Sequence, residues 1–228
     1  MDLCQLVRDF AEGMEAPDRR HPQAASHRDT TRLYRPGIGP FSEDAAVAMS
    51  LAEVQAARGD AYAAAGKRRY PASRNVCDLA VGELPDWAVE IKLARLGRDN
   101  GTYEDAAIKK ILSPYPEDRS AVTDCQKLAS SGFSGRRAVL IYGFEDPERP
   151  LVWLIEAFEA VATRVVSLGP REEAPLNHLV HPVFTAGHVY AWEVLTGYTR
   201  DDESSTLTAA QSAGESLDLT GAAWEVSR

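Results

Sequence analysis

One stretch of about twenty residues constrains the fold of this chain most. In residues 75–94, two short apolar runs flank a turn-rich Gly-Glu-Leu-Pro-Asp sequence, a pattern that predicts a β-hairpin. Side chains on a strand alternate between faces, so Glu90 and Lys92 are expected to point the same way. Together with Asp78, they place three charges in an otherwise apolar hairpin. Because burying an unpaired charge is costly, these residues are predicted to serve chemistry or metal binding.

The apolar periodicity outside the hairpin predicts an α/β fold, with a mixed central β-sheet flanked by helices. We expect helices at 2–12, 42–57, 120–131 and 151–166, a doubly covered strand at 138–144, and a closing hairpin of 179–184 with 188–195. The chain is expected to divide into an N-terminal helix and irregular arm (1–40), a main domain (41–198) and a flexible, acidic Ser/Thr-rich tail (199–228).

Composition narrows the class of protein. A net charge of −9 argues against a general polyanion binder, although residues 67–98 carry seven bases against four acids, a local net of +3. Three scattered cysteines do not suit a disulfide scaffold. Since neither a signal peptide nor an apolar run of about 20 residues is recognisable, a cytoplasmic location without membrane contact is expected.

The hairpin charges suit the hydrolysis of phosphodiester bonds. Magnesium prefers oxygen ligands, keeps several waters and is commonly held by one or two carboxylates. Asp78 and Glu90, on adjacent predicted strands, are candidate magnesium ligands, and the main-chain carbonyl of Ile91 is a third. Lys92 is placed to orient or help deprotonate the attacking water.

This arrangement resembles the PD-(D/E)xK phosphodiesterase superfamily, which has the restriction-endonuclease-like fold. The matching residues are Asp78 and Glu90-Ile91-Lys92, followed by a predicted helix and strand, over roughly residues 41–145. Cys77 stands where the motif has proline. The resemblance implies that Asp78 and Glu90 bind Mg²⁺, which Mn²⁺ can replace, and that Lys92 assists the water. Members often use an acid from the preceding helix, a place that Glu43 fits.

Further residues have alternative interpretations. Arg74, Arg95 and Arg98 are candidate contacts to nucleic-acid phosphates, but ordinary surface arginines would look the same. Asp124 flanks the inward face of the 120–131 helix, Lys127 is expected to face away, and a solvated helix surface is the simpler interpretation of both.

Three hypotheses follow. The first is a metal-dependent nuclease acting on DNA, for which a homodimer is expected to suit the cutting of both strands. The second is a catalytically silent module of the same fold that binds nucleic acid or protein within a larger defence or repair complex. In the third, Glu90 and Lys92 are simply an ion pair on one face of a strand.

Overall fold

The computed structural model describes residues 1–26, 31–83, 85–145 and 148–196. These residues form a seven-stranded mixed sheet in the order β1-β2-β3-β4-β7-β5, with β6 also paired to β7. The strands are β1 (Gly66–Arg69), β2 (Val76–Val81), β3 (Trp87–Arg95), β4 (Arg136–Glu145), β5 (Ser167–Leu168), β6 (Glu172–Leu176) and β7 (Ala186–Leu195). β3 and β4 run parallel, and the other paired strands are antiparallel. The predicted mixed sheet is therefore confirmed.

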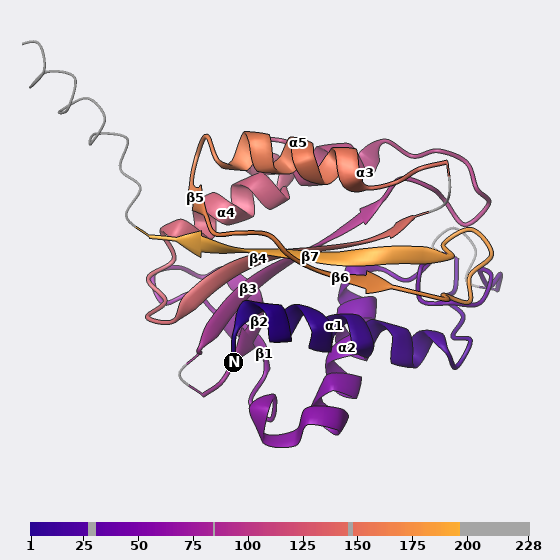
Figure 1. Ribbon diagram of the computed structural model, residues 1–228, viewed down its shortest axis with the longest axis horizontal. Helices are drawn as coiled ribbons and strands as arrows, with labels where there is room; N and C mark the ends of the chain where they lie inside the picture. The colour runs from indigo at the N-terminus through magenta and orange to yellow at the C-terminus, as the bar shows by residue number, and fades with distance from the viewer. Residues whose placement is uncertain (27–30, 84, 146–147, 197–228) are drawn as a thin grey trace, which may run out of the picture. The chain divides into compact units, whose positions relative to one another are not determined.

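Helices cover both faces of the sheet (Figure 1). α1 (Leu3–Asp18) and α2 (Glu43–Arg58) pack on one face, and α3 (Ala106–Leu112), α4 (Ala121–Ala129) and α5 (Val152–Ala162) on the other. Short 3₁₀ turns at Gly59–Ala61 and Pro116–Asp118 follow α2 and precede α4. Each helical layer closes its own hydrophobic core against the sheet, as expected when both faces of a sheet are apolar.

Several predicted elements are confirmed. The 75–94 segment is the hairpin β2–β3, the 138–144 run is the fully buried centre of β4, and Ser42 caps α2 by accepting a hydrogen bond from the Ala45 N–H. The first helix is longer than predicted, since it continues to Asp18. Its apolar face lies in the same core as α2 and the sheet, so residues 1–18 belong to the same structural unit.

The predicted closing hairpin is wrong in one strand. β7 pairs with β6 (Glu172–Leu176), and residues 177–185 form the connection between them. Pro182 interrupts the apolar 179–184 run, and His181 Nδ1 accepts hydrogen bonds from the Val183 and Phe184 N–H groups, which folds this segment as a turn. The predicted tail at 199–228 lies outside the described residues.

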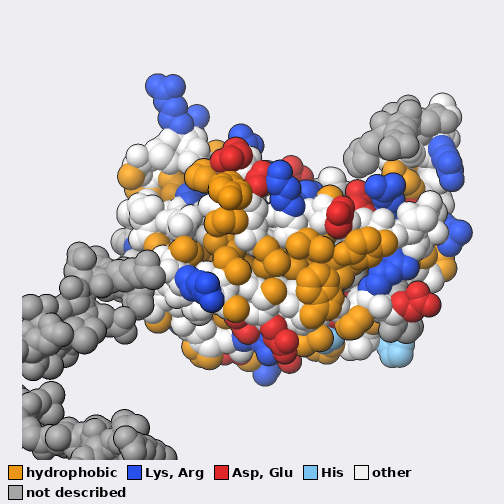
Figure 2. Space-filling model, turned by 90° about the horizontal axis from the view of Figure 1, so that it is seen from above, with side chains coloured by type: hydrophobic (Ala, Val, Ile, Leu, Met, Phe, Trp, Pro, Cys, Tyr) orange, Lys and Arg blue, Asp and Glu red, His pale blue; other side chains and the backbone are white. Residues whose placement is uncertain are grey.

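Figure 2 looks onto the side of the sheet that α3, α4 and α5 cover, where hydrophobic side chains form a band between charged ones. α5 contributes Val152 and Trp153, both exposed. The predicted helix 151–166 would place Val165 on its inward face, but this side chain is exposed, because α5 ends at Ala162 and residues 163–165 form a turn.

Candidate functional site

The candidate site lies where β2 and β3 separate. The two strands pair only between Leu79–Val81 and Trp87–Val89. Past Val89, N–H groups on this edge of β3 donate to side-chain carboxylates instead of to the backbone of β2. Asp78 Oδ2 accepts a hydrogen bond from the Ile91 N–H at 2.9 Å, and Glu43 Oε2 accepts one from the Leu93 N–H at 2.6 Å.

A bulge in β2 aims Asp78 at this edge. Gly66 pairs with Ala80 while Arg68 pairs with Cys77, so β2 has one residue more than β1 between these pairs. As a result, Cys77 packs in the core of one face and Leu79 in the core of the other, with Asp78 half-buried between them. Bulges commonly redirect side chains beside functional sites.

Asp78 and Glu90 meet in the gap between the strands. Burial raises the pKa of Glu90 to about 8, helped by the negative charges of Asp124 and Asp78. The Tyr70 hydroxyl donates a hydrogen bond to Glu90 Oε1. Two carboxyl groups that face one pocket favour a proton or a cation between them, since two bare negative charges repel each other.

Two lysines and Asp124 complete the site. Lys92 Nζ lies 2.5 Å from Asp124 Oδ2, and Lys127 Nζ lies 2.8 Å from Asp124 Oδ1 and 2.9 Å from Glu90 Oε1. Burial alone would lower the pKa of Lys92, but the Asp124 carboxylate outweighs it and the pKa is raised. Lys92 is therefore a fixed positive charge at neutral pH.

These contacts correct two predictions. Lys127 does not face away from the site but reaches Glu90, because α4 lies across the strand on which Glu90 stands. Glu90 and Lys92 do not form the simple ion pair of the third hypothesis. Each has a different partner, Lys127 for Glu90 and Asp124 for Lys92, so the charges form a network between strand and helix.

The predicted metal ligands are only partly brought together. No set of three or more His, Cys, Asp or Glu side chains among the described residues is arranged to hold a metal ion. Glu43 and Asp78 bond to N–H groups two residues apart on β3, which spaces their carboxylates by roughly 7 Å along the strand edge. Two carboxylates with the Ile91 carbonyl still make an all-oxygen donor set of the kind that suits Mg²⁺.

The Ile91 carbonyl lies at the same edge of β3. Lys92 Nζ is 3.4 Å from this oxygen, and the N–H of Ile91 already points at Asp78. In a strand, the N–H and C=O of one residue point to the same side, so the carbonyl faces the gap between β2 and β3. This geometry fits the carbonyl as a ligand beside Asp78.

A pocket of roughly 630 Å³ gives access to these groups. Asp78, Glu90 and Lys92 line one wall, and Asp124 and Lys127 line another. Polar groups from the β1–β2 loop, from α4 and from the residues on either side of α4 complete the rim, including Asn75, Arg119, Thr123, Gln126 and Ser130. All the charged residues of the site therefore line this pocket except Glu43. Glu43 lies at the start of α2 and accepts the hydrogen bond from the Leu93 N–H of β3.

The three predicted phosphate-binding arginines lie in different surroundings. Arg74 is exposed in the β1–β2 loop, next to the pocket residue Asn75. Arg98 lies past the end of β3 and pairs with Glu104 at 3.5 Å. Arg95 projects from the face of β3 opposite Lys92, and its guanidinium donates to the carbonyls of Gly39 and Phe41 at 2.5 and 3.4 Å. Arg95 thus holds the N-terminal arm against the sheet.

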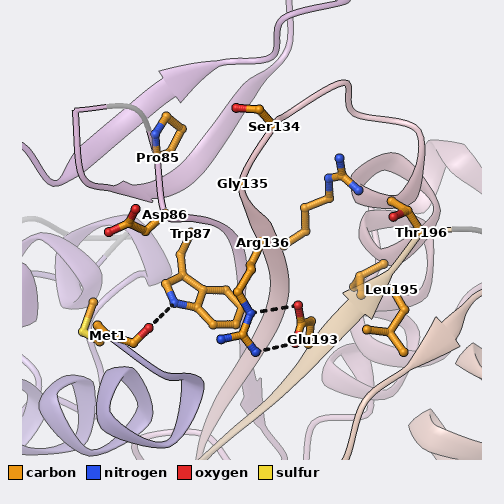
Figure 3. Close-up of a pocket in the computed structure, with 12 residues that line it drawn as sticks. Met1, Pro85, Asp86, Trp87, Ser134, Gly135, Arg136, Glu193, Leu195 and Thr196 are labelled. Atoms are coloured by element: carbon orange, nitrogen blue, oxygen red, sulfur yellow. Dashed lines mark hydrogen bonds and ion pairs between the residues drawn. The ribbon is translucent and has the colours of Figure 1, made fainter.

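A larger pocket, of about 910 Å³, opens at the first residues of β3 and β4 (Figure 3). Arg136 pairs with Glu193 at 2.9 and 2.5 Å and lies 4.1 Å from the centre of the Trp87 ring. The Trp87 indole N–H donates to the Met1 carbonyl at 3.1 Å. The polar groups of this larger pocket already form hydrogen bonds and ion pairs with one another, and these contacts link the ends of neighbouring strands. The smaller pocket is therefore the better candidate for chemistry.

Sequence reasoning missed Tyr70 and Lys127 as members of the site. Asp124 and Lys127 are three residues apart, which places them side by side on a helix, but such pairs are common on solvated surfaces. Tyr70 follows β1 and gives no local signal. Only the packing of α4 over β3 shows that all three surround Glu90.

Comparison with known proteins finds no matching family model, no matching curated protein and no matching solved structure. The resemblance to the PD-(D/E)xK superfamily therefore stays a prediction that depends on the residues of the site. In the part of the chain that the structure describes, no helix is both long enough and apolar enough to cross a bilayer.

Proposed function

We propose that this chain is a magnesium-dependent phosphodiesterase with a restriction-endonuclease-like core and DNA as its substrate. One observation carries the proposal. The carboxyl groups of Asp78 and Glu90, from two strands, line one pocket at the point where the strands separate, with the Lys92 ammonium in the same pocket. Two carboxyl groups that face one pocket mark a place where a cation is favourable.

Asp78, Glu90 and the Ile91 carbonyl are the groups that would hold Mg²⁺. A bound divalent cation supplies an activated water and offsets the charge that develops on the phosphate oxygens. In the reaction, the water oxygen bonds to phosphorus and releases its proton to solvent, the ester P–O bond breaks, and the leaving oxygen takes up a proton from solvent.

Lys92 orients this chemistry as a cation rather than as a base. Its ammonium is held by Asp124 and lies on the same side of β3 as Glu90, so it is placed to donate to the water or to a phosphate oxygen. The raised pKa of Lys92 keeps it protonated, and a fixed positive charge in a half-buried pocket stabilises a developing negative charge more strongly than one in water.

The rim supports nucleic acid as the substrate. Arg74 and Arg119 are both exposed at or beside the pocket mouth, where guanidinium groups can form paired hydrogen bonds with phosphate oxygens. The pocket is lined by polar side chains from both sides and is open to solvent, as a passing backbone requires. These features make nucleic acid a better candidate than a small apolar ligand.

A cleavage assay tests the proposal. Double-stranded DNA, single-stranded DNA and RNA of one sequence are incubated with the protein in Mg²⁺ or EDTA. We expect cleavage of DNA in Mg²⁺ alone, and a loss of at least about a hundredfold in Asp78→Asn and Lys92→Met, since each removes a group needed in the transition state. Full activity of Asp78→Asn would contradict the proposal.

Asp60→Asn and Lys109→Met are matched controls, because both side chains are exposed and neither lines the pocket. Both are expected to cleave like the wild type. Circular dichroism of all variants separates lost chemistry from lost folding.

One observation favours the silent module as a second candidate. Lys92 and Lys127 already pair with acidic side chains of the site. A protein that binds DNA equally in Mg²⁺ and EDTA, without cleavage and without metal-dependent heat in calorimetry, would support this second function.

A further inference from the structure

The ammonium of Lys127 lies between a carboxylate of its own helix and a carboxylate of β3. Its Nζ lies 2.9 Å from Glu90 Oε1 on β3 and 2.8 Å from Asp124 Oδ1 on α4. It also lies 5.4 Å from the centre of the Tyr70 ring, within the range of a cation–π contact. A carboxylate oxygen from each of two elements is a usual setting for a divalent cation, and here a lysine holds that place.

The groups around Lys127 are themselves held in position. The second oxygen of Asp124 contacts Lys92 at 2.5 Å, and the Tyr70 hydroxyl donates to Glu90. Asp124 and Lys127 are three residues apart on one helix, so their contact needs no movement of the backbone. Burial alone would lower the pKa of Lys127, but Asp124 and Glu90 outweigh it and raise the pKa.

We propose that Lys127 is a built-in cation that takes the place of a second metal ion, so that each chain binds one divalent cation, at Asp78 and Glu90. An ammonium has three N–H donors, and two carboxylate contacts leave one for a phosphate oxygen of the substrate. This inference depends on the proposed function and specifies its metal content.

The formal charges agree with a single metal ion. Glu43, Asp78, Glu90 and Asp124 carry four negative charges when ionised, against two positive charges on Lys92 and Lys127, a balance of −2. One divalent ion brings the site to neutrality. A second would leave it at +2 while also displacing Lys127 from its two carboxylates, which a half-buried site does not favour.

Manganese binding tests the number of ions without reference to activity. Equilibrium dialysis gives the number of Mn²⁺ ions per chain, and electron paramagnetic resonance distinguishes single ions from coupled pairs. We expect one ion in the wild type with a single-ion spectrum. In Lys127→Ala, the carboxylates of Glu90 and Asp124 lose their ammonium, so we expect two ions. Lys109→Ala, an exposed lysine outside the site, is expected to bind one.

Each outcome has a distinct meaning. Two ions or a coupled spectrum in the wild type would overturn the inference and leave the proposed function intact. A folded Lys127→Ala variant that binds only one ion would overturn it as well. If that variant does not fold, the number of Mn²⁺ ions in the wild-type protein and its spectrum still test the inference. A wild type that binds no manganese would remove the proposed function itself, and the inference with it.

Discussion

Glu90 is a buried acidic residue at the centre of the proposed site. Only 2% of its surface is exposed; it contacts Tyr70 and Lys127, and it lines the same pocket as Asp78. The sequence predicts its burial through its place in an apolar strand, and predicts its closeness to Asp78 through the hairpin. It does not predict Tyr70 or Lys127, because contacts between distant segments leave no local pattern.

The raised pKa of Glu90 predicts a pH dependence of stability in the metal-free protein. Between the ordinary value of 4.5 and the folded value of about 8, the folded state keeps a proton that the unfolded state has lost. Stability should therefore fall as pH rises through this window, by up to about 1.4 kcal/mol per unit. Glu90→Gln has no such proton, so its stability should fall less steeply. Urea denaturation in EDTA from pH 5 to 9 measures both slopes, and parallel slopes would contradict the prediction.

The direction of the Arg95 side chain bears on its predicted role as a phosphate contact. It shares β3 with Lys92 but lies an odd number of residues away, which puts it on the other face. We expect Arg95→Met to lower the free energy of unfolding by about 1–3 kcal/mol, since the carbonyls of Gly39 and Phe41 lose a charged donor. DNA affinity, measured by fluorescence anisotropy, should not change. A loss of affinity in a fully stable variant would restore Arg95 as a phosphate contact.

At the scale of elements, strands with continuous or alternating apolar patterns could be predicted from the sequence. Elements whose existence or position depends on packing against other segments could not. β2, β3 and β4 follow from their sequences alone. β6 could not be predicted from its sequence, because Glu172, Glu173 and Pro175 are typical of a loop although they form an edge strand. The position of α4 over Glu90 depends on its connection to β3 through α3, which periodicity cannot place.

The start of α4 should matter to the whole site. Ser120 accepts a hydrogen bond from the Thr123 N–H at 3.2 Å, and its hydroxyl donates to the Ser113 carbonyl. Ser120→Ala should cost about 1–2 kcal/mol and weaken metal binding, because Asp124 and Lys127 lie in the turns that follow. Thr163→Ala, at the exposed end of α5 and outside the pocket, is the control. Thermal melts and calorimetry measure the two effects, and equal behaviour of both variants would refute the role of the cap.

At the scale of the molecule, the N-terminal segment is part of the core rather than an appendage. Asp18, at the end of α1, accepts hydrogen bonds from the Ile38 and Val180 N–H groups, both at 2.7 Å. One buried carboxylate thus joins the first helix, the following arm and the β6–β7 connection. These contacts could not be predicted from the sequence, because irregular segments give no sign of what they pack against.

This connection predicts cooperative unfolding. Asp18→Ala leaves two N–H groups without their acceptor and should lower stability by about 2–4 kcal/mol, in a single transition that includes residues 1–18. Differential scanning calorimetry measures the effect. A separate early transition for the N-terminal segment, with the main transition unchanged, would contradict the single unit.

The central claim is that Asp78 and Glu90 bind one divalent cation in the gap between β2 and β3. Crystals soaked in Mn²⁺ and measured at the manganese absorption edge test it directly. We expect one anomalous peak per chain, within bonding distance of both carboxylates and the Ile91 carbonyl, with Lys127 still between Glu90 and Asp124. No peak between Asp78 and Glu90 at saturating Mn²⁺ would contradict the claim.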